Sequence, residues 1–283
     1  PKPVPKWDRM ASPIHVTLLS GRGCSLYLES TATMEEVKLA AQEALQQPFL
    51  QLVPDDANAE ASFTALASIP QVVASERAFA LWVNGAVVSW GNPRYGGEVK
   101  HLTEVTSLRS SKGAFCALRS DGSVVCWGDP AAGGDCAHVQ VDLYEVQQIA
   151  SSDGAFAALR SDGRVVSWGD DYCGGDSSCV QDQLQGIKEI FGASKAFVAI
   201  SNGSTVTWGH HLFGGDSSSV QARLQNTKVQ RLVATCGAVA ALLEDGQVVT
   251  WGNARQGGDS SSVQDQLRNV TDHAATAAGF AAI

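Results

Sequence analysis

One segment of this sequence recurs five times, and that recurrence constrains the fold more than any other feature. The segment AFAALRSDGRVVSWGDDYCGGD begins at Ala155, and the same frame begins at Ala78, Ala114, Ala196 and Ala238. Each copy contains a Trp-Gly pair, and the tryptophans follow one another at intervals of 37, 41, 40 and 43 residues: Trp90, Trp127, Trp168, Trp208 and Trp251. A period of about forty residues with one hairpin per unit is typical of repeat architectures such as propellers.

Each unit places Asn-Gly or Asp-Gly between two strand-like runs. These dipeptides supply the positive φ angles that tight hairpin turns require. The turn glycines are Gly85, Gly122, Gly163, Gly203 and Gly246. Because the tryptophans and these glycines stand at the same place in every unit, we interpret them as structural elements of the repeat.

A second glycine motif follows each tryptophan. Gly-Gly precedes Asp135, Asp176, Asp216 or Asp259, and Glu98 in the first unit. In later units the next residues read Ser-Ser-x-Val-Gln-x-Gln-Leu, with apolar residues four apart. An acidic residue before such a pair predicts a short capped helical turn. The alternative is a ring of carboxylates that binds cations.

The frame of a strand, Asp-Gly, a strand ending in Trp-Gly and a glycine-rich turn resembles the regulator of chromosome condensation repeat over residues 71–283. The resemblance implies a mainly β fold, a seven-bladed propeller or an open arc of blades, of which this chain supplies five units and part of a sixth. The units are shorter than is usual in that family, and Gly-Gly-Asp-Ser-Ser replaces Gly-Gln-Leu-Gly. A variant expanded in algal protists, sometimes behind a ubiquitin-like segment, is similar. Since residues 279–283 match only the first strand of a unit, we expect this chain to be a piece of a longer one.

The residues before the repeats divide into an extended lead-in, 1–12, and a small α+β segment, 13–70, which also includes a linker. Alternation and turn residues predict two strands, a capped helix and a third strand, at residues 14–19, 24–29, 33–47 and 49–53. This order resembles the first half of a ubiquitin-like β-grasp module, truncated and without a Gly-Gly terminus. The alternative is a small cap that packs on the repeats.

Charge and cysteine placement limit the possible partners and compartments. A net charge of −9 argues against nucleic-acid binding, and no apolar run is long enough to span a membrane. Cys116, Cys126 and Cys136 replace small residues of other units, which predicts reduced, structural thiols in an intracellular, reducing compartment, either the cytosol or an organelle such as a plastid. Cys173 and Cys179 are the pair to test for a disulfide.

The four residues between Trp-Gly and Gly-Gly differ from unit to unit. In a propeller, equivalent loops lie on one rim, and aromatic and arginine side chains are favoured at interfaces. The predicted partner-binding residues are therefore Arg94, Tyr95, Asp171, Tyr172, His211, Phe213 and Arg255. The alternative is that these loops vary because nothing constrains them.

The sequence shows no catalytic triad, phosphate loop, dinucleotide fingerprint or metal-ligand spacing, so we expect no enzyme activity, cofactor or metal. His210 and His211 occur in one unit only and predict a solvated turn. The leading hypothesis is a non-enzymatic protein-interaction scaffold. The alternative is a structural subunit held in a larger complex, for example a photosynthetic complex of an organelle. The resemblance also implies guanine-nucleotide exchange or substrate recruitment in ubiquitin ligases, but neither an inserted wedge nor a catalytic cysteine domain is evident.

Overall fold

The computed structural model describes residues 71–83, 85–99, 102–202, 204–225 and 227–283, and the backbone of three earlier strands. These strands are β1 (Pro13–Thr17), β2 (Gly23–Tyr27) and β3 (Gln51–Leu52), which pair antiparallel in the order β2-β1-β3. The predicted lead-in and the predicted helix at 33–47 lie outside the described residues. The resemblance to a ubiquitin-like module therefore stays a prediction.

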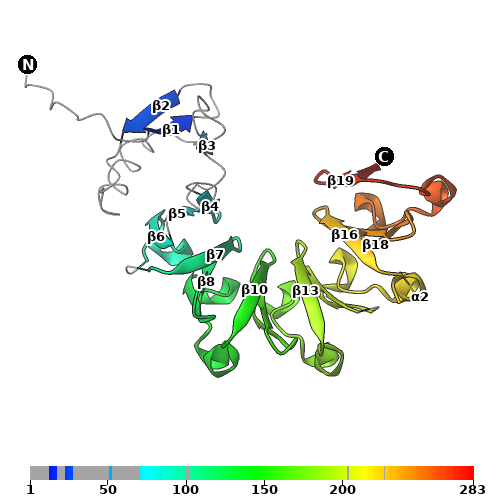
Figure 1. The fold of residues 1–283 in the computed structure, drawn as a ribbon, viewed down its shortest axis with the longest axis horizontal. Coiled ribbons are helices and arrows are strands. Elements are labelled where there is room, and N and C mark those ends of the chain that lie inside the picture. Colours follow the sequence, from blue (N-terminus) through cyan, green and yellow to red (C-terminus); the bar gives the residue numbers. More distant parts are fainter. Residues whose placement is uncertain are drawn as a thin grey trace, which may run out of the picture.

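From residue 71 onward the chain forms five three-stranded antiparallel sheets and a final two-stranded sheet, arranged along an arc (Figure 1). We call each sheet a blade and number the blades along the chain. The first three blades contain β4 (Gln71–Ala74), β5 (Ala78–Val83), β6 (Ala86–Gly91); β7 (Val105–Ser110), β8 (Ala114–Arg119), β9 (Val124–Gly128); and β10 (Val146–Ser151), β11 (Ala155–Arg160), β12 (Val165–Gly169). The others contain β13 (Ile187–Gly192), β14 (Ala196–Ser201), β15 (Thr205–Gly209); β16 (Val229–Ala234), β17 (Ala238–Leu243), β18 (Val248–Gly252); and β19 (His273–Ala275), β20 (Phe280–Ala282). The predicted mainly β repeat array is thus confirmed.

A short 3-10 turn follows the last strand of each complete blade. These turns are η2 (Pro93–Tyr95), η3 (Pro130–Ala132), η5 (Asp171–Cys173), η7 (His211–Phe213) and η9 (Ala254–Gln256). A second helical segment comes after Gly-Gly in blades two to five: η4 (Ala137–Asp142), η6 (Ser178–Gln183), η8 (Ser218–Val220) with α2 (Gln221–Leu224), and η10 (Ser261–Gln266). The short helical turn predicted from the Ser-rich motif is therefore present.

The aspartate before each of these second segments caps the segment by accepting a backbone hydrogen bond. Asp135, Asp176, Asp216 and Asp259 each accept a hydrogen bond from the N–H two residues later, at 2.8–2.9 Å. These backbone hydrogen bonds hold the pKa of Asp176, Asp216 and Asp259 below the usual aspartate value. The carboxylates thus satisfy N–H groups that a helix start leaves unpaired.

The hairpin turns obtain their positive φ from glycine. Gly85, Gly122, Gly163 and Gly246 have φ of 75–78°. Gly203 lies outside the described residues. The aspartate of the Asp-Gly turns accepts the N–H of the residue after the glycine, as Asp121 does from Ser123 at 2.9 Å. The positive φ predicted for these turns is thus present at the described turn glycines.

The Gly-Gly pair lets one blade pack closely on the next. Gly174 has a φ of 92°, and a Cβ placed there would lie 2.7 Å from the ring of Phe197 in the following blade. A Cβ on Gly175 would lie 2.4 Å from the carbonyl oxygen of Gly169. A larger residue at position 174 would therefore clash with the next blade, and one at position 175 would clash with the end of β12 in its own blade.

The tryptophans link neighbouring blades as well as filling the core. The indole N–H of each of Trp127, Trp168, Trp208 and Trp251 donates to the first Gly-Gly carbonyl of the preceding blade at 3.0–3.1 Å. Trp168 also stacks on Phe156, with ring centroids 5.8 Å apart. Trp90, in the first blade, is half-buried, and its indole N–H has no partner in the described part of the chain.

The hydrophobic core lies between blades. Leu118 and Val124 of the second blade pack with Ile149, Phe156 and Trp168 of the third in one buried cluster. A single blade cannot bury such a face alone, which is the general property of repeat arrays.

Backbone hydrogen bonds also join the turns between first and second strands of neighbouring blades. Glu76 N donates to Lys112 O, Lys112 N to Asp153 O, and Asp153 N to Ser194 O, at 2.7–2.8 Å. Cys236 N donates to Ala277 O at 3.0 Å. Among the described residues, no such bond joins Ser194 to Cys236. The junction between blades four and five therefore lacks one link that the other junctions have.

Six cysteines of the described part are free thiols, including the buried Cys173 and the exposed Cys179. Cys126 Sγ lies 3.6 Å from Cys116 Sγ. In this blade Cys126 and Cys136 stand at the positions of Ser167 and Ser177, whose hydroxyls form a hydrogen bond in the next blade. Within the ranges that the structure describes, no helix is long and apolar enough to cross a membrane.

Candidate functional site

The five 3-10 turns after Trp-Gly, which we call the η rim, begin in the same way. The residue before each turn accepts a hydrogen bond through its side chain from the N–H two residues later, at 2.9–3.1 Å. These capping residues are Asn92, Asp129, Asp170, His210 and Asn253. The sequence interpretation treated this position as freely variable, but its restriction to Asn, Asp and His was the signal of a cap.

The last residue of each turn lies against the residue just before the second strand of its blade, and the types of these two residues vary together. Where that position is a cation, the turn ends in an aromatic residue: Arg77 lies 5.2 Å from the Tyr95 ring centroid, and Lys195 lies over Phe213. Where it is glycine, the turn ends in a side chain that packs onto the glycine, because a Cβ on Gly154 would lie 3.2 Å from Cys173 Sγ. The rim is therefore built from two coupled positions in each unit.

The structure brings together three of the predicted residues and separates the others. Tyr172, His211 and Phe213 gather at the junction of blades three and four, with Asp171 exposed beside them. Arg94 and Tyr95 lie in the first blade, where the Arg94 guanidinium pairs with Asp129 at 3.2 Å. Arg255 is exposed in the fifth blade.

The gathered residues form what we call the Lys195 cluster: Tyr172, Lys195, His210, His211 and Phe213. The His210 ring meets Tyr172 and Phe213 edge-on, at centroid distances of 4.2 and 4.8 Å, and stacks on His211 at 4.9 Å. Lys195 Nζ lies 4.7 Å from the Tyr172 centroid and 4.8 Å from that of Phe213. Sequence reasoning missed Lys195 and His210, because Lys195 lies in another turn of the unit and His210 was interpreted as solvated.

Burial and two neighbouring groups lower the pKa of the central histidine of the cluster. Burial, the neighbouring His211 and the Lys195 ammonium hold the pKa of His210 below the usual histidine value. A neutral ring suits its position, because Nδ1 accepts the Leu212 N–H at 3.1 Å. No salt bridge to Lys195 is found in the described part of the chain, whereas Lys112 pairs with Asp153 at 2.9 Å.

Comparison with known proteins identifies the repeat. A family model described as the regulator of chromosome condensation (RCC1) repeat matches residues 146–174, which span the third blade's strands and its η5 turn. The third blade therefore matches the RCC1 repeat, and the other blades share its frame of a hairpin, Trp-Gly and Gly-Gly. The solved structure of yeast RCC1 (Prp20) bound to Kap60 matches with a TM-score of 0.50 at 16% identity, over 82% of this chain and 69% of that one.

Two further solved structures are similar to this chain. Prp20p from Saccharomyces cerevisiae matches at 16% identity over 83% of this chain and 72% of that one, with a TM-score of 0.48. Human WBSCR16 matches at 17% identity and a TM-score of 0.46, over 65% of this chain. The match spans 62% of the length of WBSCR16. No curated protein sequence matches the chain.

Two large apolar side chains are exposed at the junction of blades three and four. Tyr172 is 54% exposed and Leu212 is 53% exposed, one from each of the two blades. Exposed rings and a cation are the composition that protein interfaces favour.

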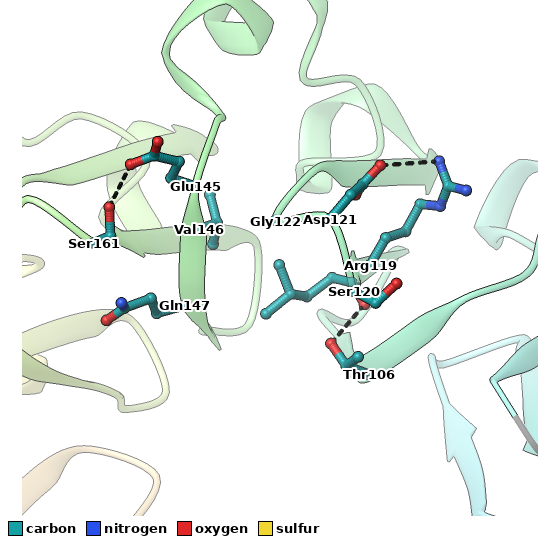
Figure 2. Close-up of a pocket in the computed structure, with 10 residues that line it drawn as sticks. Thr106, Arg119, Ser120, Asp121, Gly122, Glu145, Val146, Gln147 and Ser161 are labelled. Atoms are coloured by element: carbon teal, nitrogen blue, oxygen red, sulfur yellow. Dashed lines mark hydrogen bonds and ion pairs between the residues drawn. The ribbon is translucent and has the colours of Figure 1, made fainter.

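A cavity of about 430 Å³ lies between the Asp-Gly turns of the second and third blades. Figure 2 shows Arg119 and Asp121 on one side of it and Glu145 and Ser161 on the other. Their polar groups are already paired, because Arg119 binds Glu104 at 2.9 Å and Glu145 accepts from Ser161 at 2.6 Å. The charged groups that line the cavity are thus already paired within the chain.

Metal ligands do not gather in the part of the chain that the structure describes. No group of three or more His, Cys, Asp and Glu side chains there could hold a metal ion. The two histidines of the cluster stack on each other, and His210 meets Tyr172 and Phe213 edge-on.

Proposed function

We propose that this chain is a non-enzymatic protein-interaction scaffold that docks its partners on the η rim. The observation that carries the proposal is the Lys195 cluster, in which two blades present exposed Tyr172 and Leu212 beside a cation. The rigid blades hold these side chains in place, which lowers the ordering cost of binding. A similar fold is used for protein binding in yeast RCC1 (Prp20), which was solved bound to Kap60.

A second candidate is a structural subunit that a larger complex covers permanently. Val141 and Tyr144, which lie at the second helical segment of blade two, are 79% and 50% exposed. A subunit built into an assembly would bury such residues as well as the rim.

A photo-crosslinker placed at residue 212 or at residue 141 tests the proposal and separates the two candidates. A scaffold that uses the rim should crosslink partners in cell extract from residue 212 and not from residue 141. Replacing Tyr172 and Phe213 with alanine should abolish that crosslink while the thermal melting curve still shows a folded array. Stoichiometric crosslinks from both positions would favour the subunit, and an unchanged crosslink in the double variant would overturn docking on the rim.

A further inference from the structure

We propose that the Lys195 cluster recognises an acidic segment of a partner protein, in which a carboxylate lies beside an aromatic or aliphatic side chain. This inference rests on the proposed function, because it assigns a chemical class to the partner of the same rim. The charge and the geometry of the cluster support it.

The N–H donors of the Lys195 ammonium have no carboxylate partner among the described residues. An ammonium has three N–H donors, and the faces of Tyr172 and Phe213 attract its charge but provide no oxygen acceptor. Two other cations of the array have carboxylate partners within the chain, since Arg94 binds Asp129 and Lys112 binds Asp153. Arg77 and Arg255 have no salt bridge among the described residues. Lys195 has no salt bridge among the described residues, so a carboxylate from a partner would complete its coordination.

The amine of Lys195 also has a largely fixed position. Lysine normally loses much rotamer freedom when it binds a ligand. The amine of Lys195 already lies between two rings, which are themselves held edge-on by His210. A partner carboxylate would therefore meet a donor whose position is largely fixed.

The charges of the cluster determine which sign of charge a partner should carry. The ring faces of Tyr172 and Phe213 already carry an ammonium, so a lysine or arginine of a partner would meet a like charge where it would otherwise bind. Asp170 is engaged as a cap by the Tyr172 N–H at 2.9 Å. Asp153 is engaged by Lys112 Nζ and by Ser194 Oγ, each at 2.9 Å. Asp171 is exposed, and its charge would repel an acidic segment. Acidic recognition thus makes opposite predictions for Lys195 and Asp171.

The cluster also has an apolar component. Tyr172, whose ring contacts the amine, and Leu212, which precedes Phe213 in η7, are each more than half exposed. An aromatic or aliphatic side chain adjacent to the carboxylate would cover both and remove water from the ion pair. Desolvation strengthens such a pair beyond what an exposed surface pair contributes.

The test uses the whole chain and fluorescein-labelled synthetic peptides in which glutamate alternates with tryptophan or leucine. Matched peptides carry glutamine or lysine in place of glutamate, and binding is measured by fluorescence anisotropy. We expect the acidic peptide to bind about tenfold more tightly than the glutamine peptide and to weaken as salt rises. K195Q should remove this preference, K195R should retain it, and D171N should strengthen acidic binding.

R77Q is the control variant, because Arg77 occupies the same repeat position over Tyr95 in the first blade. It should leave acidic binding unchanged. Equal binding of the three peptides, tighter binding of the lysine peptide, or an unchanged preference in K195Q would overturn the inference. If these results appear while Y172A/F213A still abolishes the crosslink at residue 212, the rim docks proteins and only its acidic preference is wrong.

Discussion

His210 caps η7 and lies among aromatic rings, and it can do both only while its imidazole is neutral. Its Nδ1 accepts the Leu212 N–H, so a protonated ring would place a donor against a donor. The groups that face the ring are His211, Lys195, Tyr172 and Phe213. None of them is an anion that could stabilise an imidazolium.

This arrangement predicts a pH-dependent stability. The pKa of His210 is lowered in the folded chain, so the unfolded chain takes up a proton first as the pH falls through the unperturbed value of about 6.5. Stability should therefore decline below that pH. H210N keeps a cap like Asn92 and Asn253 and should remove this part of the decline, as measured by urea unfolding at several pH values. H210A should lose about 1 kcal/mol at neutral pH, and an H210N protein with an unchanged pH profile would contradict the assignment.

His273 predicts a second loss of stability in acid. It is 3% exposed at a position of the first strand where blades three and four have Ile149 and Ile190. Burial lowers its pKa, its Nδ1 has no partner among the described residues, and its Nε2 lies 3.4 Å from Ala240 O. H273I should raise the free energy of unfolding by roughly 1–3 kcal/mol, since it removes an unsatisfied buried atom. H273I should also reduce the dependence of the free energy of unfolding on pH, whether or not H210N is present. A lower free energy of unfolding at neutral pH would contradict the prediction.

At the scale of the elements, the tryptophan of each strand before an η turn stabilises a junction between blades. W168F would leave the Gly133 carbonyl without its indole donor and should cost roughly 1–3 kcal/mol, plus the effect of lost volume. W90F is the internal control, because the Trp90 indole N–H has no partner in the described residues. Its cost should be clearly smaller in the same denaturation experiment, and equal costs would mean that the interblade hydrogen bond contributes little.

The Gly-Gly turn makes a steric prediction. G174A would place a methyl group against the Phe197 ring at a φ of 92°, so backbone strain and overpacking should add to a loss of roughly 2–4 kcal/mol. Gly186 also has a positive φ, of 64°, but a Cβ there would meet nothing within 4 Å. G186A should therefore cost only the backbone part, roughly 1–2 kcal/mol. Similar losses in both variants would show that the contact with Phe197 is not tight.

Recurrence made the blades predictable, because the hairpin, the tryptophan and the glycines stand at fixed places in each unit. The pairing of Lys195 with Tyr172 and Phe213 was not predictable in the same way, since it joins two turns of one blade to a turn of another. The caps were missed because Asn92, Asp129 and His210 differ in chemistry while sharing an acceptor atom. The requirement for a side-chain acceptor at this position is therefore recognised from the hydrogen bond to the backbone N–H and not from the residue type.

At the scale of the whole molecule, the junction of blades four and five differs from its neighbours. Ser194 and Cys236 do not form the turn-to-turn hydrogen bond that links the other described junctions, although Trp251 still donates to Gly214 at 3.0 Å. Amides without such a link open locally at lower cost. Hydrogen exchange should therefore be faster at the Ser194 amide than at the equivalent Lys112 and Asp153 amides. Equal protection at the three positions would show that this junction is as tight as the others.

The tryptophan hydrogen bonds also give the array a direction. Each indole donates to a glycine carbonyl 31–37 residues earlier in the chain. During synthesis from the N-terminus, the acceptor of each bond therefore leaves the ribosome before its donor. A newly synthesised blade can therefore pack on the preceding blade, whose acceptor carbonyl has already been synthesised. The array can then grow by one blade at a time, before the C-terminal blades are synthesised.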